Sequence, residues 1–214
     1  MTKTLKAIAA TTAALLALNA DAAVDMFLDI EGEIKGESLD STYKDQIDVL
    51  AWSWAMAQSG TLHVGAGGGA GRASFGDIAV TKYIDRSSTV LYKYVANGDH
   101  FESATLTIRK PGGKPFVNEQ LVMTRVLVTS ALMGGSGGED RLTENITLNF
   151  GSFCIRYIEQ TKEGNPGAKL ELCWNIAANE SCSTAQIETL FRLPLVRSLP
   201  RGLLRELNPV CSSA

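Results

Sequence analysis

Residues 47–57 read IDVLAWSWAMA, and large and small side chains alternate along this stretch. In an extended chain the larger ones, at positions 50, 52, 54 and 56, would point to one side of the strand. The smaller and mostly apolar ones, at positions 47, 49, 51, 53, 55 and 57, would point to the other. Because both rows are mainly apolar, we expect a strand over 47–57 that is covered on both sides or forms the wall of a barrel.

The same kind of pattern fills most of residues 24–176. Short alternating runs, separated by turn residues, occur at 104–109, 119–130, 146–150, 153–157 and 170–176. One helix interrupts them: Ser87 or Ser88 can begin it, Gly98 can end it, and its apolar stripe consists of Val90, Leu91, Tyr94 and Val95. Strands that alternate with turns predict a mainly β fold, an antiparallel barrel with one short flanking helix, and not a parallel α/β sheet.

Length and composition set the broad class. A chain of 214 residues is usually one domain with appendages at most. The formal net charge is −3, which is too small to indicate binding to nucleic acid or to an anionic membrane surface. No apolar stretch is long enough to cross a bilayer, so stable membrane insertion is not expected.

The first residues have the three parts of a secretory signal peptide. Lys3 and Lys6 precede an apolar run over 7–18, and Ala20-Asp21-Ala22 has small residues where a signal peptidase reads them. A short amphipathic helix or a misassigned start codon is the alternative. We predict a signal peptide over 1–22, a barrel domain over 23–179, and a partly irregular C-terminal extension over 180–214. The predicted cleavage follows Ala22, so the mature chain would begin at Ala23.

Four cysteines suit an exported protein, in which disulfides persist. They are Cys154, Cys173, Cys182 and Cys211. The runs that hold the first two flank a turn at 161–168, and an antiparallel hairpin that opposes Cys154 to Cys173 also opposes Arg156 to Glu171. We therefore expect the first two to pair if the chain reaches an oxidising compartment, which leaves the last two for each other. Two unpaired buried thiols are the alternative.

No residue set supports catalysis. The glycine cluster at 65–71 is followed by a strand pattern instead of the helix that a dinucleotide site needs, and the cluster at 134–138 lacks the Lys-Ser/Thr of a P-loop. His63 and His100 lie in no nucleophile or metal signature. We therefore expect no enzyme activity, no catalytic residues, no cofactor and no metal.

Several strings resemble one known family, the Hcp (haemolysin-coregulated protein) family of type VI secretion systems. They occur in the family's order at 24–28, 34–38, 47–54, 81–85, 106–110, 136–145 and 174–176. The resemblance covers about residues 23–179. It differs at Ala55 and Ala57, where the family commonly has Gly and Ser, and both replacements are small.

The resemblance implies a tube protein. Family members form hexameric rings that stack into a tube, which carries small effector proteins in its lumen and is secreted. Their partners are further copies of themselves, a VgrG-type spike protein and the contractile sheath proteins. The resemblance also assigns ring-to-ring contact to the loop over 32–46, with the residues Lys35, Gly36, Glu37, Ser38, Leu39, Asp40 and Tyr43.

Two features depart from the plain family. The type VI machine takes its tube protein from the cytoplasm without a Sec signal, and the extension over 180–214 has no counterpart. Two functions therefore stay open from the sequence. The first is a secreted structural tube subunit. The second is a Sec-exported, ring-forming carrier or binding protein that acts in the periplasm or outside the cell without the contractile machine.

Overall fold

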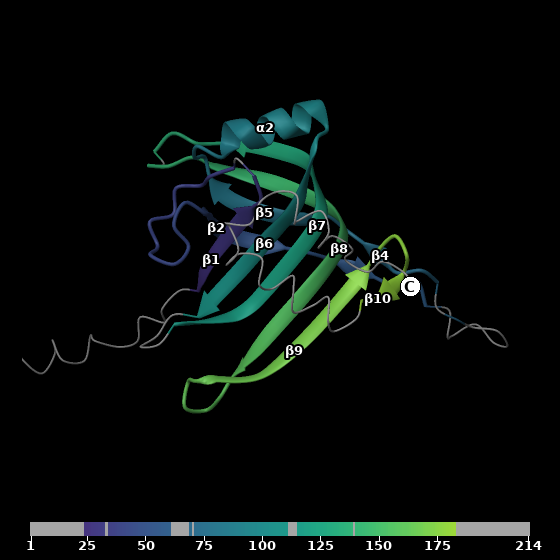
Figure 1. Cartoon of the computed structure of the whole chain (residues 1–214). Helices are drawn as coiled ribbons and strands as arrows, with labels where there is room; N and C mark the ends of the chain where they lie inside the picture. Colours follow the sequence, from purple (N-terminus) through teal and green to yellow (C-terminus); the bar gives the residue numbers. More distant parts are fainter. Residues whose placement is uncertain are drawn as a thin grey trace, which may run out of the picture.

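The structure, a computed structural model, describes residues 24–32, 34–60, 69, 71–110, 115–138 and 140–182 (Figure 1). The signal peptide prediction, His63 and Cys211 lie outside these residues. The strands and the helix are β1 (Asp25–Ile30), β2 (Ile47–Ser53), β3 (Met56–Ala57), β4 (Ser74–Phe75), β5 (Ile78–Tyr83), α2 (Ser88–Asn97), β6 (His100–Lys110), β7 (Phe116–Gly134), β8 (Thr143–Gln160), β9 (Pro166–Asn175) and β10 (Glu180–Ser181).

Six of the strands close into an antiparallel barrel. Neighbouring strands follow the order β8–β5–β2–β1–β6–β7, and β7 pairs again with β8. Closure pairs every one of these strands on both sides, so the barrel leaves no unpaired edge along its wall. The mainly β antiparallel barrel with one flanking helix is confirmed.

The long strand β8 belongs to two structures at once. Its first part pairs with β5, from Thr143 to Leu148, and its second part pairs on the same edge with β9, from Ser152 to Gln160. The runs predicted separately at 146–150 and 153–157 are therefore one strand. Beyond the barrel, β9 and the short β10 extend the sheet past β8, and Figure 1 shows the β8–β9 hairpin projecting at one end.

Where β6, β7, β8 and β9 lie side by side in the sheet, the two faces of the sheet differ. Directly opposed residues on one face are Leu106, Leu121, Ile155 and Leu172, and the next row is Ala104, Met123, Phe153 and Trp174. This face continues the barrel core. Small and polar residues such as Thr105, Thr124 and Ser152 occupy the opposite face. Period-two alternation thus separates a core face from a polar face.

The strand predicted over 47–57 is wrong in its length and in its alternation. A β-bulge shifts the register between Val49 and Ala51, and β2 ends at Ser53. Val49 is buried and Leu50 is exposed, and the bulge then inserts one residue into the pattern. After the bulge Trp52 and Trp54 pack against the core, on the side that Ile47 and Val49 occupied before it.

The predicted helix is confirmed, although the side chain of Ser87 before it forms no capping hydrogen bond. It runs from Ser88 to Asn97, and the next residue, Gly98, has a φ of 72° and closes the last turn through a bond from its N–H to the Tyr94 carbonyl. Leu91 is buried in the core, and Tyr94 stacks on Phe101 of β6. Val95, predicted on the apolar stripe, is exposed. Within the described part of the chain, no helix has the length and apolarity to cross a membrane.

Candidate assembly surfaces

In the loop over 32–46, which is predicted to join rings, the backbone near the start of the loop lies close to the backbone at its end. Gly36 N–H donates to the Asp45 carbonyl at 2.8 Å, and Ser38 N–H donates to the Gln46 carbonyl at 3.0 Å. A Cβ at position 36 would lie 2.2 Å from the Gln46 carbonyl oxygen and 2.5 Å from the Ile47 Cα. These atoms belong to the backbone and cannot move away cheaply, so only glycine fits here.

Arg109 on β6 holds the middle of the loop against the barrel. Its guanidinium donates at 2.8 Å to Asp25 of β1 and at 2.5 Å to Asp40 of the loop. The same group lies over two aromatic rings, with its Cζ 5.2 Å from the Phe27 centroid and 5.4 Å from the Tyr43 centroid. Those rings stack with centroids 4.5 Å apart. One side chain therefore combines two ion pairs with two cation–π contacts.

These contacts set the charges of the cluster. The hydrogen bond from Arg109 holds the pKa of Asp40 below its ordinary value, and amide donors from Thr42 and Tyr43 act in the same direction. In return, the hydrogen bond to Asp40 raises the pKa of Arg109. Burial raises the pKa of the Tyr43 phenol. The carboxylate of Asp40 is thus ionised at neutral pH and serves both as ion-pair partner and as acceptor for the loop backbone.

A second arginine, Arg86, holds the base of the loop from the start of the helix. Its Nε donates to the Gly36 carbonyl at 2.6 Å, and its Nη2 lies 2.7 Å from Asp45 Oδ1. Its backbone N–H donates to Glu37 Oε1 at 3.1 Å. Asp45 has a φ of 62°, a left-handed conformation that lets the chain turn back toward β2. The loop is thus bound at its base by Arg86 and at its middle by Arg109.

A buried ion cluster holds the helix on the barrel. Lys82 Nζ of β5 lies 2.6 Å from Glu144 Oε1 of β8 and 2.8 Å from Asp85 Oδ1. Ser88 Oγ and the Tyr92 hydroxyl of α2 also donate to the Glu144 carboxylate. Burial and the hydrogen bond to Glu144 raise the pKa of Tyr92 to about 12. The cluster thereby ties the first turns of α2 to two barrel strands.

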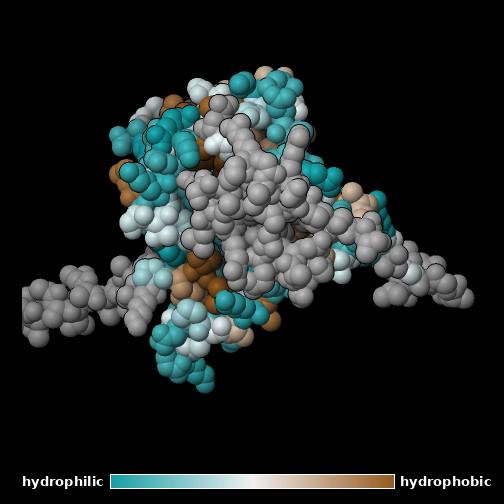
Figure 2. All heavy atoms as spheres, viewed as in Figure 1, coloured by the Kyte–Doolittle hydropathy of each residue, from teal (hydrophilic) through white to brown (hydrophobic). Residues whose placement is uncertain are grey.

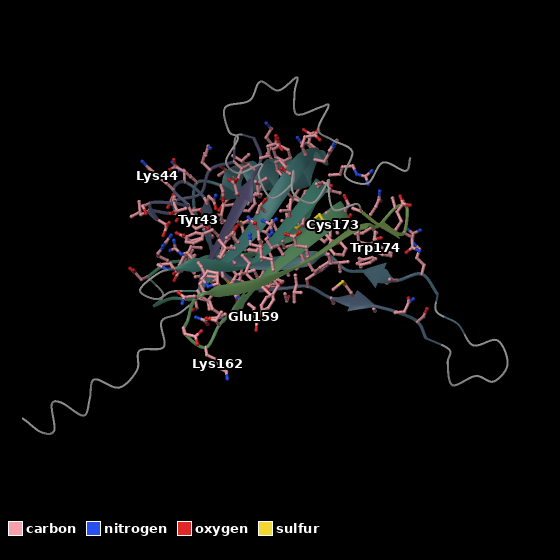
Figure 3. All side chains as sticks on the ribbon, turned by 60° about the horizontal axis from the view of Figure 1, so that its bottom comes forward. Tyr43, Lys44, Glu159, Lys162, Cys173 and Trp174 are labelled. Carbon is pink, nitrogen blue, oxygen red and sulfur yellow. A yellow bond between two sulfur atoms is a disulfide. The ribbon has the colours of Figure 1, made fainter. Side chains whose placement is uncertain are left out.

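Because of these bonds, the predicted loop residues lie in one connected segment with unequal roles. Gly36 and Ser38 are buried, Lys35, Asp40 and Tyr43 are half-buried, and Glu37 is exposed. Leu39 has 94% of its surface exposed. A leucine held outward between two fixed points is a candidate contact for another molecule. Figure 3 shows the labelled Tyr43 and Lys44 of this loop toward the opposite side of the molecule from Cys173 and Trp174.

Two further groups of exposed apolar residues lie at opposite ends of the β7–β8 ladder. The hairpin-end group consists of Tyr157, Leu170 and Leu172, and the barrel-end group consists of Leu132, Met133 and Leu142. The hairpin-end group continues the core face of β8 and β9, where Ile155 and Trp174 are half-buried against the core. Figure 2 shows hydrophobic surface above the hydrophilic tip of the molecule's lower end. The surface therefore offers two unlike apolar areas.

The barrel, its flanking helix and this loop match one family of proteins. A family model described as "Type VI secretion system effector, Hcp" matches residues 27–157. This chain belongs to the Hcp family. The protein Hcp1 of Pseudomonas aeruginosa is 51% identical to it over 160 residues, which cover 73% of this chain and 98% of that relative.

Solved structures of type VI secretion proteins agree. Hcp1 from Salmonella typhimurium is 33% identical, with a TM-score of 0.62, over 74% of this chain and 99% of that one. A type VI secretion system effector from Yersinia pestis is 30% identical, with a TM-score of 0.58, over 71% of this chain and 99% of that one. These three relatives are thus matched over nearly their whole length, while part of this Hcp-family chain lies outside each of these three matches.

The hairpin register that the sequence predicts for this Hcp-family chain is confirmed. Cys154 opposes Cys173, and Arg156 opposes Glu171 with Nε 2.5 Å from Oε1. The two cysteines form a disulfide, with their Cα atoms 4.0 Å apart. Cys182 is also disulfide-bonded. That these bonds form in an oxidising compartment remains a prediction.

The described part of this Hcp-family chain contains no cluster of three or more His, Cys, Asp or Glu side chains that could hold a metal ion. His100, the one histidine within it, is exposed at the start of β6. The sequence reasoning missed the roles of Arg109, Arg86 and Lys82. Arg109 and Lys82 lie in strings that carried the family resemblance, at 106–110 and 81–85, and that was the signal available.

Proposed function

We propose that this protein is the structural tube subunit of a type VI secretion system. Its copies close into hexameric rings, the rings stack into a tube, and the tube is secreted with small effector proteins in its lumen. The likeness to Hcp1 of Pseudomonas aeruginosa over nearly the whole of that protein supports this proposal. The partners that follow are further copies of the chain, a VgrG-type spike protein and the sheath proteins.

The loop over 32–46 makes the contact between rings in this proposal. The observation that carries it is the outward position of Leu39 on a loop bound by Arg109 and Arg86. A loop fixed before assembly loses little conformational entropy when it binds. An exposed leucine then gains free energy by burial against the next ring.

Contacts within a ring use the two apolar groups in this proposal. A ring forms when one surface of each subunit binds a different surface of the next and the rotation closes. The hairpin-end and barrel-end groups are unlike and lie at opposite ends of one ladder, which suits a head-to-tail contact. A single self-complementary group would favour a dimer instead.

Electron microscopy of Leu39→Asp tests the loop. We expect single rings to persist and stacked rings to be lost, because a charge replaces the buried leucine only between rings. Leu50→Asp, an exposed leucine on β2 outside the loop, is the matched control and should keep the stacks. If the wild-type protein shows no rings at high concentration, the tube function is wrong. If rings stack equally well with Leu39→Asp, the loop assignment is wrong.

The second candidate is a Sec-exported carrier that works without the contractile machine. The signal-like residues 1–22 and the cysteine pair Cys154–Cys173 favour it, because disulfides persist outside the cytoplasm. Secretion measured in cells with and without a functional sheath separates the two candidates. Mass spectrometry of the exported protein should show a chain that begins at Ala23. Exported material that keeps Met1 would exclude Sec processing.

A further inference from the structure

The hairpin-end apolar group has a carboxylate in its midst. Glu119 of β7 directly opposes Ile108 of β6 on one side and Tyr157 of β8 on the other. Beyond Tyr157 the same row continues to Leu170 of β9, which has 63% of its surface exposed. Because directly opposed side chains share a face of the sheet, the Glu119 carboxylate lies in a row of apolar side chains.

No cation among the described residues pairs with the Glu119 carboxylate. Its pKa is raised by burial, and no hydrogen bond or ion pair from a described residue acts against that rise. The ion pair of Arg156 with Glu171 belongs to the other face of β8 and β9, because these residues alternate with Tyr157 and Leu170. The hairpin end therefore offers a neighbouring molecule both an apolar surface and a negative charge.

The barrel-end group has a cation beside it. Arg141 immediately precedes Leu142, and its Cζ lies 4.0 Å from the centroid of the Tyr83 ring. The Leu142 carbonyl accepts a bond of 2.9 Å from the Ile84 N–H, which holds the backbone next to Arg141 in place. Within the described ranges of the chain, Arg141 takes part in no ion pair. A guanidinium that lies over a ring can still bind a carboxylate through the N–H groups at its edge.

The two charges lie too far apart to meet within one subunit. Glu119 lies near the start of β7, whereas Arg141 lies next to Thr143, which opposes Gly134 at the end of β7. A strand rises about 3.3 Å per residue, so roughly 50 Å of β7 separates Glu119 from Gly134. Contact between these two charges therefore requires two copies of the chain.

We propose that Glu119 of one subunit forms an ion pair with Arg141 of the next subunit in the ring. This inference rests on the ring-forming function proposed above and names the residues that join the hairpin end to the barrel end. Each subunit then uses Glu119 toward one neighbour and Arg141 toward the other, as a head-to-tail contact requires.

The apolar side chains around the pair give it strength and direction. Tyr157 and Leu170 on one subunit and Leu142 on the other are exposed, so their burial in the contact excludes water around the two charges. Exclusion of water strengthens the attraction between them. Contact between two hairpin ends, or between two barrel ends, would bring like charges together, so the pair favours a ring over a two-fold dimer.

Charge reversal in two separate proteins tests the pair. Glu119→Arg makes both ends of the subunit positive, and Arg141→Glu makes both ends negative. We expect each variant alone to lose its rings, measured by electron microscopy and light scattering, at concentrations where the wild type forms them. An equimolar mixture should form rings again, because alternating subunits bring unlike charges together at every contact. Native mass spectrometry of these rings should show equal numbers of both chains.

The matched control is Glu163→Arg, which makes the same change of charge in the exposed turn of the same hairpin and should keep the rings. The proposal is overturned if either single variant forms rings as well as the wild type does, or if the mixture forms none. Restored rings also show that both variants fold. If the wild type itself forms no rings, the tube function fails and this pair with it, whereas rings that ignore both reversals exclude only the pair.

Discussion

Two ion clusters in this molecule use the same chemistry at different depths. Lys82 meets Glu144 and Asp85 under the helix, and Arg109 meets Asp25 and Asp40 beside the loop. The Lys82 side chain exposes 1% and that of Glu144 none, whereas the Arg109 side chain exposes 17% and that of Asp25 42%. Each cluster joins one cation to two carboxylates, and the two clusters differ in how deeply they are buried.

Burial changes what such a cluster can do. A buried charge cannot lose its partner without a large desolvation cost, so the Lys82 cluster holds the helix in a single position. A half-exposed cluster contributes little to overall stability because water replaces a lost partner. Arg109 therefore mainly fixes the conformation of the loop that we propose to bind the next ring. The Lys82 cluster therefore stabilises the fold, and the Arg109 cluster holds the exposed surface of the loop in place.

The largest expected effect comes from removing the buried cation. Lys82→Met leaves the Glu144 and Asp85 carboxylates buried without their cation, which should lower the free energy of unfolding by about 3–5 kcal/mol. Urea unfolding followed by tryptophan fluorescence measures it. A loss below about 1 kcal/mol would show that water reaches the cluster and that the contrast with Arg109 is false.

A compensating change should recover part of that loss. Adding Glu144→Gln to Lys82→Met removes one uncompensated charge, while the new amide oxygen can still accept a bond from Ser88 or Tyr92 and the amide NH2 can donate to the other hydroxyl. The double variant should therefore be more stable than Lys82→Met alone by about 1–2 kcal/mol. The same unfolding experiment decides it. Additive losses would mean that Lys82 and Glu144 act independently despite their contact.

Arg109→Gln should reduce ring stacking more than it reduces the stability of the fold. We expect a loss of only about 1 kcal/mol in the free energy of unfolding, because Asp25 and Asp40 are both partly exposed to water. Ring stacking should fall much more strongly, since the loop loses its bonds to Asp40 and its contacts with Phe27 and Tyr43. Arg109→Lys keeps the charge without the planar guanidinium and should fall between the two. Equal stacking by all three proteins would contradict the role of Arg109.

The smallest effect is a pH dependence. The pKa of Asp40 is lower in the folded protein than in the unfolded chain, so its ion pair stabilises the fold above the unfolded pKa, near pH 4. That stabilisation is lost as the pH falls through the folded value. The stability difference between the wild type and Asp40→Asn should be about 1 kcal/mol or less at pH 6 and should shrink as the pH falls below about 4. Urea midpoints across that pH range measure it, and a difference that does not change with pH would refute the ion pair.

Local patterns were enough to predict much of the fold. The C-terminal end of the helix follows from Gly98, whose backbone freedom acts within one turn. The pairing of Cys154 with Cys173 follows from the register of one hairpin, because the position numbers of directly opposed residues there add up to the same value. Both depend on neighbours in the sequence. The barrel class follows in the same way from the succession of strands and turns.

Features that depend on distant residues could not be predicted. The bulge after Val49 arises where β2 pairs with β5, more than two dozen positions later, so alternation alone placed Leu50 with Trp52 and Trp54. Arg109 meets Asp25 and Asp40 only after β1 and β6 pair. Lys82 and Glu144 oppose each other across a β5–β8 pairing that no local pattern specifies. In the sequence alone, nothing distinguishes these charged residues from charged residues on the surface.

The loop over 32–46 contains one position that the fold fixes as glycine and another position that can change without harm to the fold. Gly36 cannot become any other residue without moving the backbone at Gln46 and Ile47, whereas Leu39 touches so little of its own subunit that its replacement costs the fold almost nothing. If the loop joins rings, the side chain that selects the neighbour can diverge while the frame that holds it is kept. Two such proteins in one cell could then become unable to build mixed tubes through a change at a single exposed position.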